Sequence, residues 1–235
     1  MIGLVFIGIV FMVIGSLISS RLKSKFAQYS QVGLSNGLSG EEIARKMLND
    51  NGIYDVKITQ VDGQLTDHYN PLDKTVNLSS DVYHGRSAAS AAVAAHEVGH
   101  AVQHANAYAA LKMRSAMVPA VNIASRVMGM ANMFLMFGGI ALISQNNPVG
   151  NTLLMVLIVA NLALALFALI TLPVEFDASK RALNWMETRN VVSQREHAMA
   201  KDALKWAAMT YVVGAAAAMA NLLYFVMIFL GRRDD

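Results

Sequence analysis

Two histidines and a glutamate in one short run have the spacing of a metal site. The run is Ala94-Ala95-His96-Glu97-Val98-Gly99-His100-Ala101-Val102. On an α-helix, residues four apart lie on one face, so His96 and His100 can bind one Zn²⁺ while Glu97 points to the neighbouring water or substrate position. This H-E-x-x-H pattern predicts the centre of a zinc peptidase, with Glu97 as its general base.

A hydrolytic zinc site needs a third protein ligand, because the fourth position is kept for water. His104 lies eight helical positions after His96, about 12 Å along the axis, so the two cannot reach one ion. The extended pattern H-E-x-x-H-x-x-G-x-x-H also fails, because Gln103 and Asn106 occupy its Gly and His positions. We therefore expect the third ligand to be an acid on a later helix.

The acid that we favour is Glu175, in the segment PVEFDAS over residues 173–179. This segment is expected to begin a helix at the cytoplasmic edge of a membrane span, where the motif helix must dock. Glu175 and Asp177 would also suit a helix N-terminus without any metal. Because the two histidines still need a ligand, we choose Glu175 over Asp177, and we expect Glu187 and Glu196 to be solvated.

The elements around the motif predict a small α+β unit. A capping box over residues 39–42 opens a helix, and residues 56–66 are expected to form a β-hairpin that turns at Asp62-Gly63. A further short strand is predicted over residues 74–78, and the Ala-rich motif helix over 87–108. Helix, small antiparallel sheet and then H-E-x-x-H helix is the element order of a zincin-like catalytic domain.

The composition indicates a membrane protein. The 235 residues are 55% hydrophobic and 15% charged, an unusual balance for a soluble chain. The absence of cysteine excludes disulfides and cysteine-based metal sites. The net charge of +3 is small and scattered, so the sequence gives no support for nucleic-acid binding.

Four apolar segments are long enough to cross a bilayer, which takes about 20 residues. They are residues 2–19, about 117–143, about 152–172 and about 207–230. The first is interpreted as an uncleaved span, because no basic residue precedes it and three follow it directly. The uncharged loop 144–151 makes the next two a membrane hairpin, and the polar residues 21–38 look like a connector.

These segments divide the chain into five predicted parts: a transmembrane anchor (1–20), a zincin catalytic half with the motif helix (21–116), a transmembrane hairpin (117–172), a cytoplasmic helical region with the third zinc ligand (173–206), and a transmembrane helix and tail (207–235). The second part holds ten Lys and Arg and the fourth holds six, against none in the loop of the hairpin. The positive-inside rule therefore predicts a multi-pass protein of the cell membrane, with its catalytic site facing the cytoplasm and both termini outside.

The motifs also resemble a known family. AAHEVGHAVQH, the preceding LTDHYNP and the later PVEFDASKRAL are similar to the YugP-type putative neutral zinc metallopeptidases over nearly the whole chain. That family is similar in its catalytic core to the HtpX and CAAX-prenyl membrane zinc proteases, whose third ligand is a Glu in a Glu-x-x-x-Asp pattern. The resemblance implies one Zn²⁺ per chain, held by His96, His100 and Glu175, with Glu97 as the general base.

The sequence departs from that pattern at Ser179, which stands where those relatives have the Asp that orients a ligand histidine. Either Ser179 or Asp177, or another acid, is therefore expected to hold a ligand histidine by a hydrogen bond.

Substrate contacts are predicted from the remaining polar residues. A peptide is expected to add as a strand to an edge over residues 74–79, with contacts from His68 and from the strand residues Thr75, Val76, Asn77 and Leu78. His68, Tyr69, His197 and Tyr211 are candidates for a second electrophile beside the zinc. Tyr211 is our first choice, although each of the four also suits an ordinary structural place. Membrane anchoring makes membrane proteins or peptides presented at the lipid bilayer the expected substrates.

Two other functions compete with this interpretation. In an intramembrane, site-2-type protease, residues 87–109 would themselves span the bilayer, but the three His, one Glu and one Gln in that run make insertion costly. A non-proteolytic membrane scaffold that regulates partners could keep a structural zinc or none. The intact Glu97 argues against a scaffold, because a structural site needs no general base.

Overall fold

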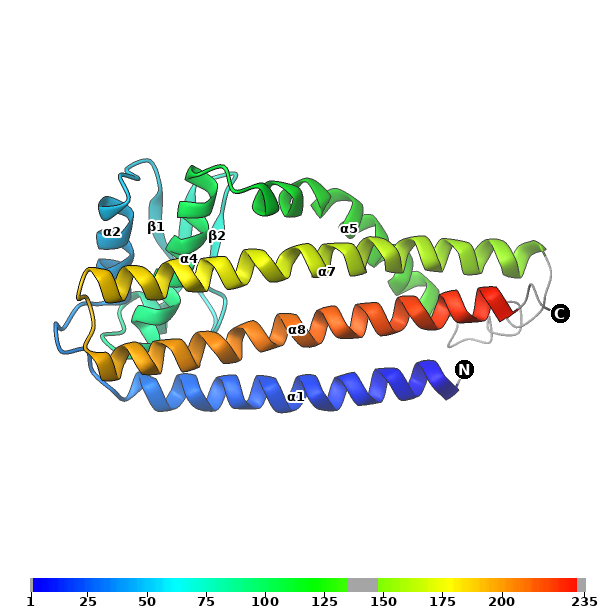
Figure 1. Ribbon diagram of the computed structural model, residues 1–235, viewed down its shortest axis with the longest axis horizontal. Coiled ribbons are helices and arrows are strands. Elements are labelled where there is room, and N and C mark those ends of the chain that lie inside the picture. Colours follow the sequence, from blue (N-terminus) through cyan, green and yellow to red (C-terminus); the bar gives the residue numbers. More distant parts are fainter. Residues whose placement is uncertain (1, 135–147, 232–235) are drawn as a thin grey trace. The chain divides into compact units, whose positions relative to one another are not determined.

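The computed structural model describes residues 2–134 and 148–231, and its contacts divide the chain into two compact units. The span unit comprises Met1–Ser16, Met113–Leu172 and Tyr211–Asp235, and the motif unit comprises Leu17–Lys112 and Pro173–Thr210. Each of the four long helices has residues in both units (Figure 1). The H-E-x-x-H residues and Glu175 all belong to the motif unit, so the candidate site is described within that unit alone.

Four long helices account for most of the described residues. They are α1 (Ile2–Ser30), α5 (Ala109–Phe134), α7 (Pro148–Thr188) and α8 (Gln194–Gly231). Among the described residues, α1 from Gly3, α7 and α8 are long and apolar enough to cross a membrane. A fourth span was expected over 117–143. Its residues 135–143 lie outside the described residues, and its earlier part belongs to α5.

Two of the expected breaks between elements do not occur. The connector predicted from residue 21 begins only after Ser30, because residues 21–30 contain no Gly or Pro to end α1. Near that end of α1, the hydroxyl of Tyr29 donates a 2.6 Å hydrogen bond to the carboxylate of Asp202 in α8. Residues 173–179 do not begin a helix either, since α7 continues through Pro173. Glu175 therefore lies inside a helix, and the preference of acids for helix N-termini does not explain it.

The capping box forms as the sequence predicts and opens α2 (Gly40–Asp50). The Ser39 hydroxyl accepts from the backbone N–H of Glu42 at 3.2 Å, and the Glu42 carboxylate accepts from the backbone N–H of Ser39 at 2.7 Å. The buried face of α2, with Ile43 and Met47, packs into the core of the motif unit.

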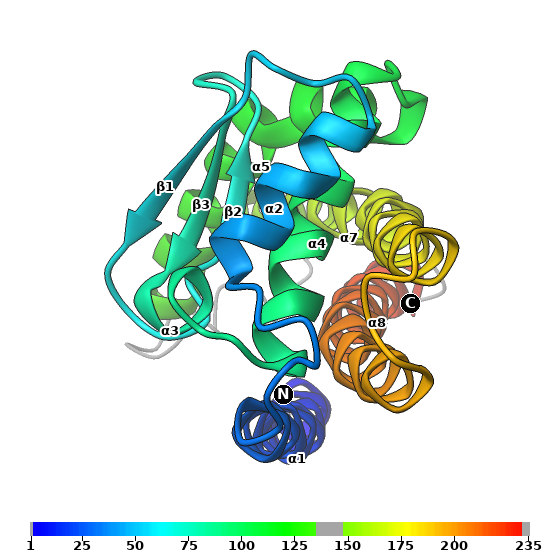
Figure 2. The ribbon, with the colours of Figure 1, turned by 90° about the vertical axis from the view of Figure 1, so that its left-hand side faces the viewer.

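The sheet is mixed, and the predicted antiparallel hairpin is wrong. Strand β3 (Thr75–Ser79) lies between β1 (Lys57–Val61) and β2 (His68–Asn70), parallel to β1 and antiparallel to β2 (Figure 2). Residues 64–66 form no strand beside β1. The physical reason is burial: Val76 and Leu78 of β3 are fully buried, so β3 takes the central position of the sheet.

This topology also corrects the prediction of the substrate edge. Because β1 pairs with one side of β3 and β2 with the other, the backbone of Thr75, Val76 and Asn77 has no free edge for a peptide, and Leu78 pairs with β1 on one side. Val76 and Leu78 point into the core, and the Asn77 amide donates to the Thr75 hydroxyl at 2.9 Å. The edges of this three-stranded sheet are β1 and β2.

The motif helix α4 (Ala88–Ala105) forms the centre of the motif unit. Its N-cap Ser87 accepts from the backbone N–H of Ser90 at 3.2 Å, after the short helix α3 (Ser80–Tyr83). Most of α4 from Ala88 to Gln103 is buried. Its many alanines leave room for close neighbours, and α2, β3, α7 and α8 all contribute to the core that surrounds it.

Gly99, in the middle of the motif, marks a close approach of α4 to α7. A Cβ atom placed on Gly99 would lie 2.6 Å from the backbone oxygen of Ala178. Since an ordinary Cβ contact exceeds 3 Å, only glycine allows this spacing. The contact sets α7 directly against the face of α4 that carries the two histidines.

Gly99→Ala should therefore destabilise the protein by about 1–3 kcal/mol, although alanine is the better helix former, because the added methyl group must push two backbones apart. The melting temperature of the detergent-solubilised chain measures the change. Gly214→Ala in α8 is the matched control, since nothing lies within 4 Å of its Cβ position, and it should be neutral or stabilising. An equal melting temperature for Gly99→Ala and wild type would contradict this account of the packing.

Candidate metal centre

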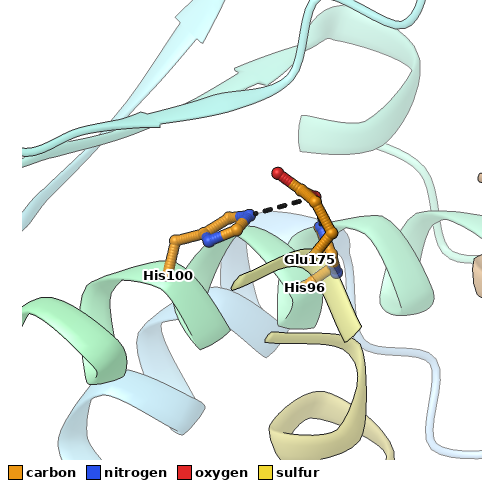
Figure 3. Close-up of side chains that lie close together, drawn as sticks. All are labelled: His96, His100 and Glu175. Carbon is orange, nitrogen blue, oxygen red and sulfur yellow. Dashed lines mark hydrogen bonds and ion pairs between the residues drawn. The ribbon is translucent and has the colours of Figure 1, made fainter. Parts of the chain in front are cut away.

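Three ligand-type side chains from two helices converge in the motif unit. His96 and His100 come from α4 and Glu175 from α7, and one ligand atom of each lies within 4.8 Å of the other two (Figure 3). The Oε2 atom of Glu175 is 3.3 Å from Nε2 of His96 and 3.6 Å from Nε2 of His100. Two imidazoles and a carboxylate are a donor set that suits Zn²⁺.

Each histidine is held at its other ring nitrogen. Nδ1 of His96 lies 3.1 Å from the hydroxyl of Ser179, and Nδ1 of His100 lies 3.0 Å from the amide oxygen of Gln103. Because an amide oxygen can only accept, Nδ1 of His100 must donate, and in the neutral ring Nε2 then carries a lone pair. Hydrogen bonds at Nδ1 that leave Nε2 for a metal are typical of zinc-binding histidines.

Gln103 is a site residue that the sequence did not reveal as such. Its side chain is fully buried, and its amide nitrogen donates to the backbone oxygen of Val174 and to Asp177, each at 2.8 Å. These two bonds fix which end of the amide faces His100. The available signal was its position three residues after His100 on a helix, whereas the pattern H-E-x-x-H-x-x-G-x-x-H marks Gln103 only as a mismatch.

Ser179 and Asp177 both reach the histidines, in different ways. Ser179 contacts His96 directly, while Asp177 acts through Gln103 and also accepts a 2.6 Å hydrogen bond from Arg181. A hydroxyl and an amide thus lie next to the Nδ1 atoms of His96 and His100, and the carboxylate of Asp177 stands one residue further out.

Glu97 follows His96 on α4 and is buried, with 7% of its surface exposed. Burial raises the pKa of its carboxyl, the positive charges of His96 and His100 oppose that rise, and the negative charges of Glu175 and Asp67 add to it. Burial lowers the pKa of His100, but its interaction with Glu175 and the charge of Glu97 outweigh this and raise the pKa overall. A carboxyl with a raised pKa is suited to taking and returning a proton near neutral pH.

Comparison with known proteins decides the family. The model of a family described as putative neutral zinc metallopeptidase matches residues 4–230. The chain belongs to this family. It is also 44% identical to the putative membrane protease YugP of Bacillus subtilis (strain 168) over 215 residues, which cover 92% of this chain and 91% of that protein. No solved structure matches the chain.

Membership of the zinc metallopeptidase family agrees with the centre built from α4 and α7. The family description points to zinc, and the three grouped side chains form a possible site for it. The name of the relative and the three apolar helices agree on a membrane protein.

Three of the other predicted residues, Tyr69, His197 and His68, already have hydrogen-bond partners. The Tyr69 hydroxyl lies 2.7 Å from Nδ1 of His104, and burial raises the pKa of Tyr69 to about 12. His197 bonds the backbone oxygen of Leu183 at 3.2 Å. His68 is exposed on β2, with Nδ1 2.8 Å from the oxygen of Thr66. Tyr211 belongs to the span unit, and its role as an electrophile stays a prediction.

Proposed function

We propose that the chain is an integral-membrane zinc endopeptidase in which His96, His100 and Glu175 bind one Zn²⁺. The observation that carries the proposal is the convergence of two Nε2 atoms and one carboxylate, with both Nδ1 atoms held by Ser179 and Gln103. A structural zinc site is normally closed by four protein ligands, whereas three leave a position for water. Three grouped ligands beside a buried Glu97 therefore favour hydrolysis over a scaffold.

The chain's own residues would carry the proton chemistry. A zinc ion held at this centre would lower the pKa of a water towards about 7 and polarise the substrate carbonyl. Glu97 would take the proton of the attacking water and pass it to the leaving amine. The burial that raises the pKa of Glu97 helps it to hold the proton between the two steps.

The peptide substrate is proposed to pair with β2 in place of β3. β2 bonds β3 on one side only within the described sheet, and it contacts α4. A peptide strand added there would bond the backbone of His68–Asn70. His68 keeps its proposed role in substrate binding on this edge.

The site is proposed to face the cytoplasm, and its substrates to be membrane-associated or unfolded proteins. The ten Lys and Arg of residues 21–116 and the six of 173–206 support this orientation. The burial of α4 among α2, β3 and α7 supports a site outside the bilayer core, and disfavours the intramembrane alternative in which residues 87–109 span.

Removal of the metal tests the proposal. The purified chain in detergent should hold about one zinc, and a chelator should cut its cleavage of an unfolded membrane-protein substrate by more than about 100-fold. Added Zn²⁺ should restore cleavage, as followed by gel or mass spectrometry of the products. Undiminished cleavage by zinc-free protein would overturn the proposal.

A further inference from the structure

The parts of α7 and α8 that belong to the motif unit line a second feature, an open groove of about 460 Å³. The two helices lie side by side there (Figure 2). Its floor is mainly apolar and includes Phe176, Leu183, Leu204 and Ala208. Phe176 is 46% exposed, although it is a large aromatic residue. The groove is thus an apolar surface that the motif unit leaves open.

The rim of the groove is cationic. Lys180 of α7 and Lys201 and Lys205 of α8 are all exposed, against the single carboxylate of Glu187. Within the described part of the chain, Lys180 and Lys201 make no ion pair or hydrogen bond. Lys205 lies within electrostatic range of Asp202, but that carboxylate already binds Lys25 at 2.9 Å. Three lysines therefore surround an apolar floor, and carboxylates of the motif unit neutralise little of their positive charge.

The groove begins where the apolar runs of its two helices end. Phe176 follows Leu172, the end of the run in α7, by four residues or about 6 Å of helix rise. Ala208 already belongs to the apolar run of α8, and Lys205 stands just before it. The end of the groove at Phe176 and Ala208 thus lies at the depth of the polar headgroup layer, which extends about 5–7 Å beyond each side of the hydrocarbon core, and the rest of the groove extends away from the apolar runs.

We propose that this groove binds an anionic phospholipid, with acyl chains against Phe176 and Ala208 and the phosphate among the three lysines. A lipid supplies both an apolar part, for the end of the groove nearest the apolar runs, and an anionic part for the lysines. An acidic peptide would match the lysines but would leave the apolar floor facing the membrane without a partner. Binding at this groove does not depend on the proposed peptidase activity.

The test measures lipid binding to the full chain in detergent. Native mass spectrometry with phosphatidylglycerol and with phosphatidylcholine of the same acyl chains should show tighter binding of the anionic lipid. Lys180→Gln combined with Lys201→Gln should weaken phosphatidylglycerol binding about 25-fold, since each lysine contributes about fivefold at an anionic surface. Both residues are exposed, so the variant should fold, and an unchanged melting temperature without lipid verifies this.

The matched control is Arg21→Gln combined with Lys23→Gln. These residues also follow an apolar run, on α1, but do not line the groove. The control pair should change the affinity for phosphatidylglycerol by less than about twofold. If the two double variants lost affinity equally, the effect would come from general surface charge, and the proposal would be overturned. The proposal would also be overturned if sn-glycerol 3-phosphate, which lacks acyl chains, bound as tightly as the lipid. Tight, lysine-dependent binding of an acidic peptide without binding of lipid would assign the groove to a peptide instead.

Discussion

Glu97→Gln should leave zinc bound and reduce peptide-bond cleavage by about 10²–10⁴-fold or more, because the amide cannot accept the proton of the attacking water. Glutamine has nearly the same shape as glutamate, and His96 and His100 keep their bonds to Ser179 and Gln103. Zinc content by elemental analysis and cleavage of an unfolded membrane-protein substrate give the two readouts.

Stability provides a check on that result. Burial raises the pKa of Glu97, so the folded protein disfavours its charged form, and a neutral glutamine should not lower the melting temperature. Glu41→Gln is the control, since Glu41 pairs with Arg45 on α2 and should not affect cleavage. Cleavage at the wild-type rate by zinc-loaded Glu97→Gln would eliminate the proposed mechanism.

Glu175→Gln should lower the affinity for zinc by more than about 100-fold, since the loss of a ligand costs more than the 10–100-fold typical of residues that only orient one. Glu175 is the one acid of the described chain grouped with both Nε2 atoms. The amide removes the negative charge but keeps the side chain's size. Competition with a chelator of known affinity measures the zinc affinity directly, without relying on peptidase activity.

Asp177→Asn is the comparison that separates a ligand from a residue that orients one. Asp177 touches Gln103 and Arg181 but neither histidine, so this change should weaken zinc binding by no more than about 10–100-fold. If Asp177→Asn released the metal while Glu175→Gln retained it, the assignment of the third ligand would be wrong.

Local features of the fold followed from the sequence because they depend on neighbouring residues. The capping box at Ser39 needs only a hydroxyl and a carboxylate three residues apart, and it forms as predicted. The histidine pair needs only the helical period, and α4 is helical throughout. The long apolar runs of α1, α7 and α8 likewise have the length that a bilayer requires.

The sheet did not follow, because strand order is set by contacts between distant residues. Asp62-Gly63 has the local chemistry of a hairpin turn, yet β1 pairs in parallel with β3. Burying Val76 and Leu78 in the middle of the sheet outweighed the local turn preference. The substrate edge was misplaced for the same reason, since an edge is defined only once all the strands are placed.

By itself, the sequence determined the chemistry of the centre: two histidines on one helical face, a glutamate beside them, and the need for a third ligand. The period of a single helix is enough to place the two histidines on one face. The sequence also favoured Glu175 as the third ligand, but only the tertiary structure shows that its carboxylate lies beside both histidines and that Gln103 contacts His100. Gly99 lets α7 approach α4 so that Glu175 reaches both histidines, and Gln103 is oriented by Val174 and Asp177, more than 70 residues away in sequence. Such contacts arise from packing between helices, which no local pattern encodes.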